Sequence, residues 1–170
     1  PDANFSKKNP EASHDFSSNI LDSFLNEAIH NGVKKFIYFS SAHVYQIKNG
    51  GVLNEESPTI SDHPYGVHKI IAEQTLINKK ELIEINIIRL SNVFGIPSNK
   101  NLNCWKLVVN DFCKQAVLDK KILINSDGNQ VRNFVSIHEV CRLIDFMITF
   151  FCKGKLLPTI FNFGGNWTLS

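Results

Sequence analysis

Along the chain, short and largely apolar runs alternate with longer segments in which apolar residues recur at helical spacing. The runs at 35–39 and 85–90 are typical of parallel strands that are covered on both faces. The segments at about 17–30 and 64–79 place their apolar residues on one side of a helix, and Asn31-Gly32 supplies a stop signal for the first of them. Helices that alternate with buried strands predict an α/β fold with a doubly wound parallel sheet.

The remaining segments are assigned in the same way. Residues 1–16 are polar and rich in turn-forming residues, which predicts a loop with little regular structure. Loops are also predicted between the serines at 40–41 and residue 62, and after the strand at 85–90. Toward the C-terminus the pattern predicts helices at about 102–118 and 137–151, short strands at 122–124 and 160–163, and an extended segment at 133–136.

Bulk composition narrows the class of protein. Hydrophobic residues make up 43% and charged residues 20% of the 170 residues, values that are ordinary for a globular domain. A net charge of +2 without a basic stripe indicates neither a nucleic-acid nor a membrane partner, and no apolar run approaches the length of a membrane-spanning helix. The four cysteines show neither metal-ligand spacing nor a secreted disulfide framework, so we expect reduced thiols, no metal site and a cytoplasmic location.

Candidate chemistry is concentrated at the start of the helix at 64–79. Tyr65 and Lys69 are four residues apart and therefore lie on the same side of that helix, which Pro64 begins. An ammonium group beside a phenol favours the phenolate, so the spacing predicts a pKa of Tyr65 that is lowered towards neutrality. Such a tyrosine could serve as a general acid or base, with a nearby serine hydroxyl holding the reacting oxygen. The alternative is a surface helix with a tyrosine packed on a lysine stem.

The order of these features resembles that of a known family. A strand that ends in Ser40-Ser41, a loop, a Tyr-x-x-x-Lys helix and a further strand are similar to the second half of an extended short-chain dehydrogenase/reductase, the family of NAD-dependent sugar-nucleotide epimerases and dehydratases. Three later segments also match the family pattern in the right order: Arg89 to Gly95 (Arg-x-x-Asn-Val-Phe-Gly), Asp127 to Val135, and Phe161 to Gly165. The resemblance covers nearly the whole chain.

The resemblance implies a role for each matching residue. Ser41 is the catalytic serine, with Ser40 as the fallback, and Tyr65 is the general acid or base. Lys69 lowers the pKa of that tyrosine and bonds the cofactor ribose. Asn19 opens the helix through Leu25 and Ala28 and supports the lysine. The residues implied at the cofactor, NAD or NADP, are Asn19, Ser40, Tyr65, Lys69, Leu90 and Ser91. The residues implied at the substrate, a nucleotide sugar, are Ser41, Ala42, His43, Asn92 and Arg132.

The same resemblance sets the expected organisation of the chain. It implies a Rossmann-like sheet that is incomplete at the N-terminal side, because the printed sequence has no glycine-rich segment after a first strand. The segment at about 17–95 is expected to form the catalytic half of the sheet. The segment at about 96–170 is expected to contain the start of a small substrate-binding subdomain, whose elements are interleaved with the last strands. Family members commonly pair through the helices equivalent to 17–30 and 64–79, so we expect a homodimer with a four-helix interface.

The two residues that follow the implied catalytic serine indicate which of the family's reactions to expect. In the family's sugar 4,6-dehydratases an Asp-Glu pair follows that hydroxyl, whereas this chain has Ala42 and His43 there. The resemblance therefore favours 4-epimerisation or keto-sugar reduction over dehydration. His43 is interpreted as a solvated loop residue, with an additional acid–base role as the alternative. A competing hypothesis for the whole chain is a catalytically inactive nucleotide-binding or scaffold protein with this fold.

Overall fold

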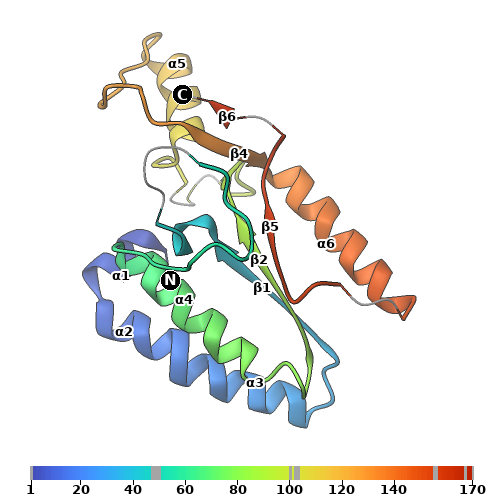
Figure 1. The fold of residues 1–170 in the computed structure, drawn as a ribbon. Coiled ribbons are helices and arrows are strands. Elements are labelled where there is room, and N and C mark those ends of the chain that lie inside the picture. Colours follow the sequence, from blue (N-terminus) through green and yellow to red (C-terminus); the bar gives the residue numbers. More distant parts are fainter. Residues whose placement is uncertain are drawn as a thin grey trace. The chain divides into compact units, whose positions relative to one another are not determined.

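A computed structural model describes residues 2–46, 51–99, 101, 104–154, 157–166 and 168–169 of the chain (Figure 1). The chain folds as two compact units. The first unit comprises Pro1–Leu90 and Leu157–Phe163, and the second comprises Ser91–Leu156 and Gly164–Ser170. Both contain helices and parallel strands, which confirms the α/β class.

The first unit is built on a three-stranded parallel sheet in the order β1-β2-β5. The strands are β1 (Lys35–Ser41), β2 (Glu84–Leu90) and β5 (Ile160–Phe163). Ser41 pairs with Leu90, and Leu90 pairs with Phe163, so the three strands end level with one another. In parallel α/β sheets ligands bind at this carboxyl edge, and the register therefore places Ser40 and Ser41 where a ligand site is expected.

The helices that precede β1 in the sequence pack against the helix that follows it, within the first unit (Figure 1). The chain begins with α1 (Ala3–Lys8) and α2 (Pro10–Asp15), continues through a π-helical turn at Phe16–Ile20 into α3 (Leu21–His30), and adds α4 (Pro64–Ile77) after β1. The predicted helices at 17–30 and 64–79 are thereby confirmed. The core joins α3, α4 and the sheet through Leu21, Leu25, Ala72, Leu76, Ile83, Ile85 and Ile87.

The predicted loop at residues 1–16 is wrong, because most of that segment is helical. Asp2 caps α1 by accepting a hydrogen bond from the backbone N–H of Phe5, and Pro10 begins α2. The side chains that these helices bury are small and polar, namely Ser6, Ser13 and Ser17. Both helices and the π-helical turn contact α4. A buried helix face made of serines has the composition of a loop, which explains the misassignment.

The second unit combines a short sheet with two helices. In it β3 (Asn92–Phe94) runs parallel to β4 (Arg132–Ser136), and β6 (Thr168–Leu169) runs antiparallel to β4. The helices are α5 (Val108–Leu118) and α6 (Ile137–Cys152), and α6 begins with a capping box formed by Ser136 and Glu139.

Two predictions in the second unit need correction. The predicted start of α5 at about 102 is too early, because the described helix begins at Val108; residues 102–103 lie outside the described residues. The predicted strand at 122–124 is absent from the described elements, and Ile122, Leu123 and Ile124 are all exposed. Three consecutive apolar residues resemble a buried strand in sequence, but none of the described strands pairs with them.

Two kinds of structural feature are absent from the described part of the chain. Over these residues no helix is long and apolar enough to cross a membrane. The described side chains likewise form no cluster of three or more His, Cys, Asp or Glu residues suited to a metal ion. The four cysteines are free thiols, and all but Cys104 are exposed.

Candidate active site

The carboxyl end of β1 turns directly into the candidate site. Ser41 is the last residue of β1, and the short 3-10 turn Ala42–Val44 follows it. The Ser41 hydroxyl is buried, accepts a hydrogen bond from the backbone N–H of His43 at 3.2 Å, and lies 3.0 Å from Nδ1 of the same imidazole. The ring of His43 is exposed and meets the ring of Tyr65 edge-on at 5.7 Å between centroids. Ser41 also lies near enough to Tyr65 to lower the pKa of its phenol.

Lys69 lies beside Tyr65, but its described hydrogen bonds go to two other residues. Its Nζ donates to the carbonyl oxygen of Phe39 at 2.7 Å and to the hydroxyl of Tyr38 at 3.2 Å. The same nitrogen lies 5.6 Å from the centroid of the Tyr65 ring. The structure therefore brings Ser41, Tyr65 and Lys69 together at the end of β1, with the ammonium held against the strand.

The predicted direction of the Tyr65 pKa is wrong for the chain as described. Burial raises this pKa above its ordinary value, and the carboxylate of Asp2 adds to the rise, whereas the hydrogen bond from Ser41 lowers it. The spacing argument assumed that the Lys69 charge acts mainly on Tyr65. Instead that ammonium group is committed to Phe39 and Tyr38, and desolvation of the phenol outweighs it.

Burial also lowers the pKa of Lys69, to about 8, although the carboxylate of Glu73 opposes the shift. A lysine that is neutral at pH 9 in the folded state binds fewer protons there than the unfolded chain does. We therefore expect the free energy of unfolding to rise from pH 8 to pH 10. Above about pH 10 the trend reverses, since burial raises the pKa values of Tyr38 and Tyr65 and the folded state then retains protons that the unfolded chain loses.

The measurement is urea unfolding at pH 7, 8, 9 and 10. In Lys69→Met the rise between pH 8 and pH 10 should disappear. In Lys80→Met, which removes an exposed lysine just beyond α4, the rise should persist. A Lys69→Met protein that keeps the same dependence on pH would contradict the assignment.

Gly66 fixes the distance between the turn after β1 and the start of α4. A Cβ atom at this position would lie 2.2 Å from the carbonyl oxygen of His43 and 2.1 Å from Oγ of Ser61. The first of these is a backbone atom that cannot rotate away. Glycine therefore allows the helix that carries Tyr65 to approach the turn that follows Ser41. His63 caps the same helix through a hydrogen bond from the backbone N–H of Tyr65 to its Nδ1, at 3.2 Å.

A buried polar network lies behind the site, and sequence reasoning did not find it. The carboxylate of Glu73 on α4 accepts a hydrogen bond from Oγ of Ser40 at 2.5 Å. It also forms an ion pair with Arg89 on β2, in which Nη2 of the guanidinium lies 2.6 Å from Oε2 of Glu73. Arg89 also donates to the hydroxyl of Tyr45, which in turn donates to Oδ1 of Asn162 on β5. Ser40 is thus occupied by Glu73, and Ser41 is the serine whose hydroxyl adjoins Tyr65.

Asn19 does not open a helix as expected, because the helical segment runs without interruption from Pro10 to His30. Its side chain is exposed and donates to Asp15 Oδ1 at 2.7 Å, one turn earlier. The described hydrogen bonds of Lys69 go to Tyr38 and Phe39 instead. A role of Asn19 toward a cofactor therefore stays a prediction.

The later predicted residues belong to the second unit, apart from Leu90 at the end of β2. Ser91 has a buried Oγ with no hydrogen-bond partner among the described residues. Asn92 uses its Nδ2 to bond the carbonyl oxygen of Asn133 at 2.9 Å, which ties β3 to β4. Arg132 is exposed and donates to Gln130 Oε1 at 2.8 Å. The structure leaves the roles of these three residues as predictions.

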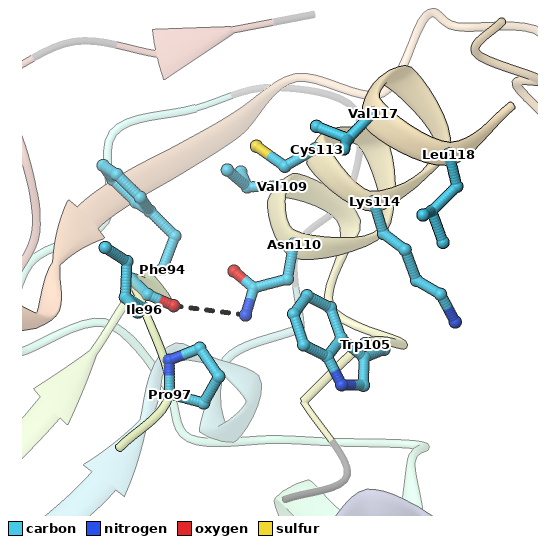
Figure 2. A pocket seen from close by; sticks show the side chains of 11 residues that line it. Phe94, Ile96, Pro97, Trp105, Val109, Asn110, Cys113, Lys114, Val117 and Leu118 are labelled. Carbon is cyan, nitrogen blue, oxygen red and sulfur yellow. Dashed lines mark hydrogen bonds between the residues drawn. The ribbon is translucent and has the colours of Figure 1, made fainter. Parts of the chain in front are cut away.

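The second unit also contains a cavity of about 650 Å³ beside α5 (Figure 2). Its walls are mainly apolar and include Phe94, Pro97, Trp105 and Val109. Asn110 stands at the wall and donates from Nδ2 to the carbonyl oxygen of Gly95 at 3.2 Å, as Figure 2 shows. Sequence reasoning assigned this region to substrate binding without finding the cavity, because its walls come from two segments that no motif links.

Comparison with known proteins identifies the family. The model of the NAD dependent epimerase/dehydratase family matches residues 3–164. This chain belongs to that family. Among curated members, dTDP-D-glucose 4,6-dehydratase of Mus musculus is 30% identical over 152 residues, which cover 86% of this chain and 39% of the relative. A putative UDP-glucose 4-epimerase of Methanocaldococcus jannaschii is 30% identical over 113 residues, 65% of this chain and 36% of the relative.

Solved structures agree with this family and show how much of its members the chain represents. UDP-N-acetylglucosamine 4-epimerase from Methanobrevibacter ruminantium M1 superposes with a TM-score of 0.83 at 21% identity, over 99% of this chain and 53% of that one. UDP-glucuronic acid 4-epimerase from Bacillus cereus, solved with NAD, superposes with a TM-score of 0.71 at 27% identity. This match covers 89% of this chain and 46% of the epimerase chain. The chain thus has the Rossmann-like fold of the family and spans about half the length of these members or less.

Proposed function

We propose that this chain is the catalytic half of a nicotinamide-dependent enzyme that interconverts a hydroxyl and a ketone on the sugar of a nucleotide sugar. The observation that carries the proposal is the grouping of Ser41, Tyr65 and Lys69 at the carboxyl end of β1. A half-buried phenol beside a serine hydroxyl and an ammonium group is suited to proton transfer. A helix surface that only packs a tyrosine on a lysine stem has no need of the serine.

The proposal gives each of these residues a task. Tyr65 takes the proton of the sugar hydroxyl, or returns it to the keto oxygen, and Ser41 holds that oxygen by a hydrogen bond. The raised pKa of Tyr65 suits the return step, because a neutral phenol has the proton that a keto oxygen needs. When bound, NAD or NADP accepts and returns the hydride. Lys69 supplies positive charge at the edge of the sheet.

The residues present fit a nicotinamide cofactor. Ser91 directly follows β2 and has a buried hydroxyl without a hydrogen-bond partner in the described part of the chain, and a carboxamide could supply that partner. Lys69 Nζ bonds a hydroxyl and a carbonyl at the end of β1, a position from which it can also reach a ribose. Leu90 and Ser91 would thus hold the nicotinamide side of the cofactor. Asn19 and Ser40 remain further predicted contacts.

The choice of reaction rests on the turn after Ser41. Dehydratase and epimerase are both among the relatives, so family membership leaves both reactions open. Ala42 and His43 provide no carboxylate at the two positions after the serine, and an elimination of water needs a group that removes a carbon-bound proton. We therefore favour 4-epimerisation or keto-sugar reduction. Asn92 and Arg132 are the proposed contacts to the nucleotide sugar, and Arg132 suits a diphosphate because its guanidinium is a planar fork.

A homodimer and a cytoplasmic location complete the proposal. The π-helical turn and α3 expose Phe16, Ile20 and Phe24, which follow one another at intervals of four residues. An apolar stripe of this kind needs cover from another segment or chain. Pairing through α3 and α4 of two copies is one arrangement that would provide it. Nothing in the descriptions of the relatives favours a catalytically inactive scaffold.

The decisive test is an assay of the full-length native protein, loaded with NAD, against UDP-, GDP- and dTDP-sugars, with products identified by NMR. We expect a C4 epimer without net NADH, or a reduced keto sugar when NADH is supplied. Formation of a 4-keto-6-deoxy sugar would overturn the choice of reaction. A folded, NAD-loaded protein that converts none of these sugars would contradict the proposed function.

A further inference from the structure

The ammonium group of Lys69 is held by β1 at two points. Its Nζ donates to the carbonyl oxygen of Phe39 at 2.7 Å and to the hydroxyl of Tyr38 at 3.2 Å. The same nitrogen lies 4.6 Å from the centroid of the Tyr38 ring, which is within the range of a cation–π interaction. An ammonium group has three N–H donors. The contacts with β1 take two of them and leave one for a ligand at the edge of the sheet.

A carboxylate that could capture this ammonium lies one turn further along α4. Lys69 and Glu73 are four residues apart, and opposite charges at that spacing on a helix attract one another. The carboxylate of Glu73 instead accepts from Oγ of Ser40 and from two nitrogens of Arg89. Because a carboxylate offers about four acceptor sites, room remains for a further donor. Pairing of Lys69 with Glu73 would draw the ammonium one turn further from Tyr65.

The strand β1 gives each of these two charges a partner of its own. Successive side chains of a strand point to opposite faces, so Tyr38 and Ser40 lie on the same face of β1. That face meets α4, since Tyr38 bonds Lys69 and Ser40 bonds Glu73. The phenol oxygen accepts from the ammonium, whereas the serine hydroxyl donates to the carboxylate. Burial raises the pKa of Tyr38, so its hydroxyl remains a neutral acceptor near neutral pH.

We propose that Tyr38 is a positioning residue that holds the ammonium of Lys69 at the edge of the sheet and keeps it from pairing with Glu73. The purpose of this arrangement rests on the proposed function, in which Lys69 supplies charge beside Tyr65 and reaches the cofactor ribose. The contacts themselves do not depend on a substrate. The described titratable groups that interact with the ammonium are Tyr38 on β1 and Tyr65 and Glu73 on α4.

The test measures the pKa of Lys69 and the affinity for NAD in the full-length protein, with Tyr38→Phe as the main variant. This change removes the hydroxyl and keeps the aromatic ring. We expect the pKa of Lys69 to rise from about 8 to about 9 or higher, because Glu73 becomes the preferred partner and an opposite charge favours the ammonium. The dissociation constant for NAD should increase about tenfold, the loss expected for one hydrogen bond to a charged group.

Two measurements provide these values. Competitive amine labelling with acetic anhydride between pH 6 and pH 11, quantified at Lys69 by mass spectrometry, gives the pKa. Calorimetric titration with NAD gives the affinity. As a matched control, Tyr45→Phe removes a different hydroxyl, which bonds Arg89 and Asn162, and should leave the pKa of Lys69 unchanged.

A second background tests the role of Glu73 directly. In a protein that carries Glu73→Leu and Arg89→Met, adding Tyr38→Phe should lower the pKa of Lys69, because the ammonium loses an acceptor and no carboxylate replaces it. A rise that persists in this background would overturn the inference. So would an unchanged or lowered pKa of Lys69 in Tyr38→Phe alone, or an unchanged affinity for NAD.

The labelling experiment needs neither NAD nor a sugar, which separates this inference from the proposed function. A failed substrate screen together with the expected changes in the Lys69 pKa would contradict the proposed function alone. Turnover of a nucleotide sugar by a protein in which Tyr38→Phe leaves the Lys69 pKa unchanged would contradict the positioning role alone.

Discussion

Tyr65→Phe in the full-length, NAD-loaded protein is expected to lower kcat at least 100-fold. The variant keeps the ring that packs edge-on against His43 and removes only the hydroxyl that would exchange a proton with the sugar. Loss of a positioned general acid or base typically costs a factor of about 10² to 10⁴. The measurement is turnover of the sugar identified by the substrate screen, together with NAD content and the urea midpoint of both proteins.

The matched control removes a different phenol. Tyr45→Phe deletes a buried hydroxyl that bonds Arg89 and Asn162, outside the group formed by Ser41, Tyr65 and Lys69. We expect this variant to lose stability and to keep turnover at temperatures where it is folded. If Tyr65→Phe retains more than a tenth of the native kcat, proton transfer by this tyrosine is disproved.

The largest effect on stability is expected from Glu73→Ala, which should lower the free energy of unfolding by about 3 to 5 kcal/mol. The change leaves the guanidinium of Arg89 without its carboxylate partner, although only 4% of that side chain is exposed. It also removes the acceptor of the buried Ser40 hydroxyl. An uncompensated buried charge is among the costliest defects in a folded protein. Urea unfolding at pH 7 measures the change.

Two controls separate burial from charge. Asp22→Asn breaks the more exposed ion pair with Lys79, whose atoms lie 3.0 Å apart, and should cost less than about 1 kcal/mol. Combining Glu73→Leu with Arg89→Met replaces both buried charges by apolar groups and should recover most of the loss. A cost below about 1 kcal/mol for Glu73→Ala would show that the pair contributes little to the fold.

The sequence predicted those parts of the fold that follow from local pattern. The strands at 35–39 and 85–90 and the helices at 17–30 and 64–79 were found because an apolar run or a helical stripe marks each of them. The first helices were missed because they bury serines, whose polarity indicates a loop. The strand predicted at 122–124 was wrong because apolar character alone does not supply a partner strand.

The site shows the same division between local and long-range information. Tyr65 and Lys69 were proposed from their spacing, and Ser41 from the resemblance of its segment to that of the family. The sign of the Tyr65 pKa was missed because it depends on burial and on where Lys69 bonds, which spacing does not determine. The pairing of Glu73 with Arg89 was missed because it joins α4 to β2 across 16 residues without a motif.

The missing side chain at Gly66 has a consequence for how the site tolerates changes in protonation. Hydroxyl and imidazole groups such as those of Ser41, His43 and Tyr65 can exchange donor and acceptor roles when protons move, so polar contacts alone cannot hold a constant spacing. Steric exclusion can, because the backbone of α4 at Gly66 rests against the carbonyl oxygen of His43 whatever the protons do. The distance between serine and tyrosine is thus set by the shape of the backbone, which keeps the gap between their polar groups at a fixed width.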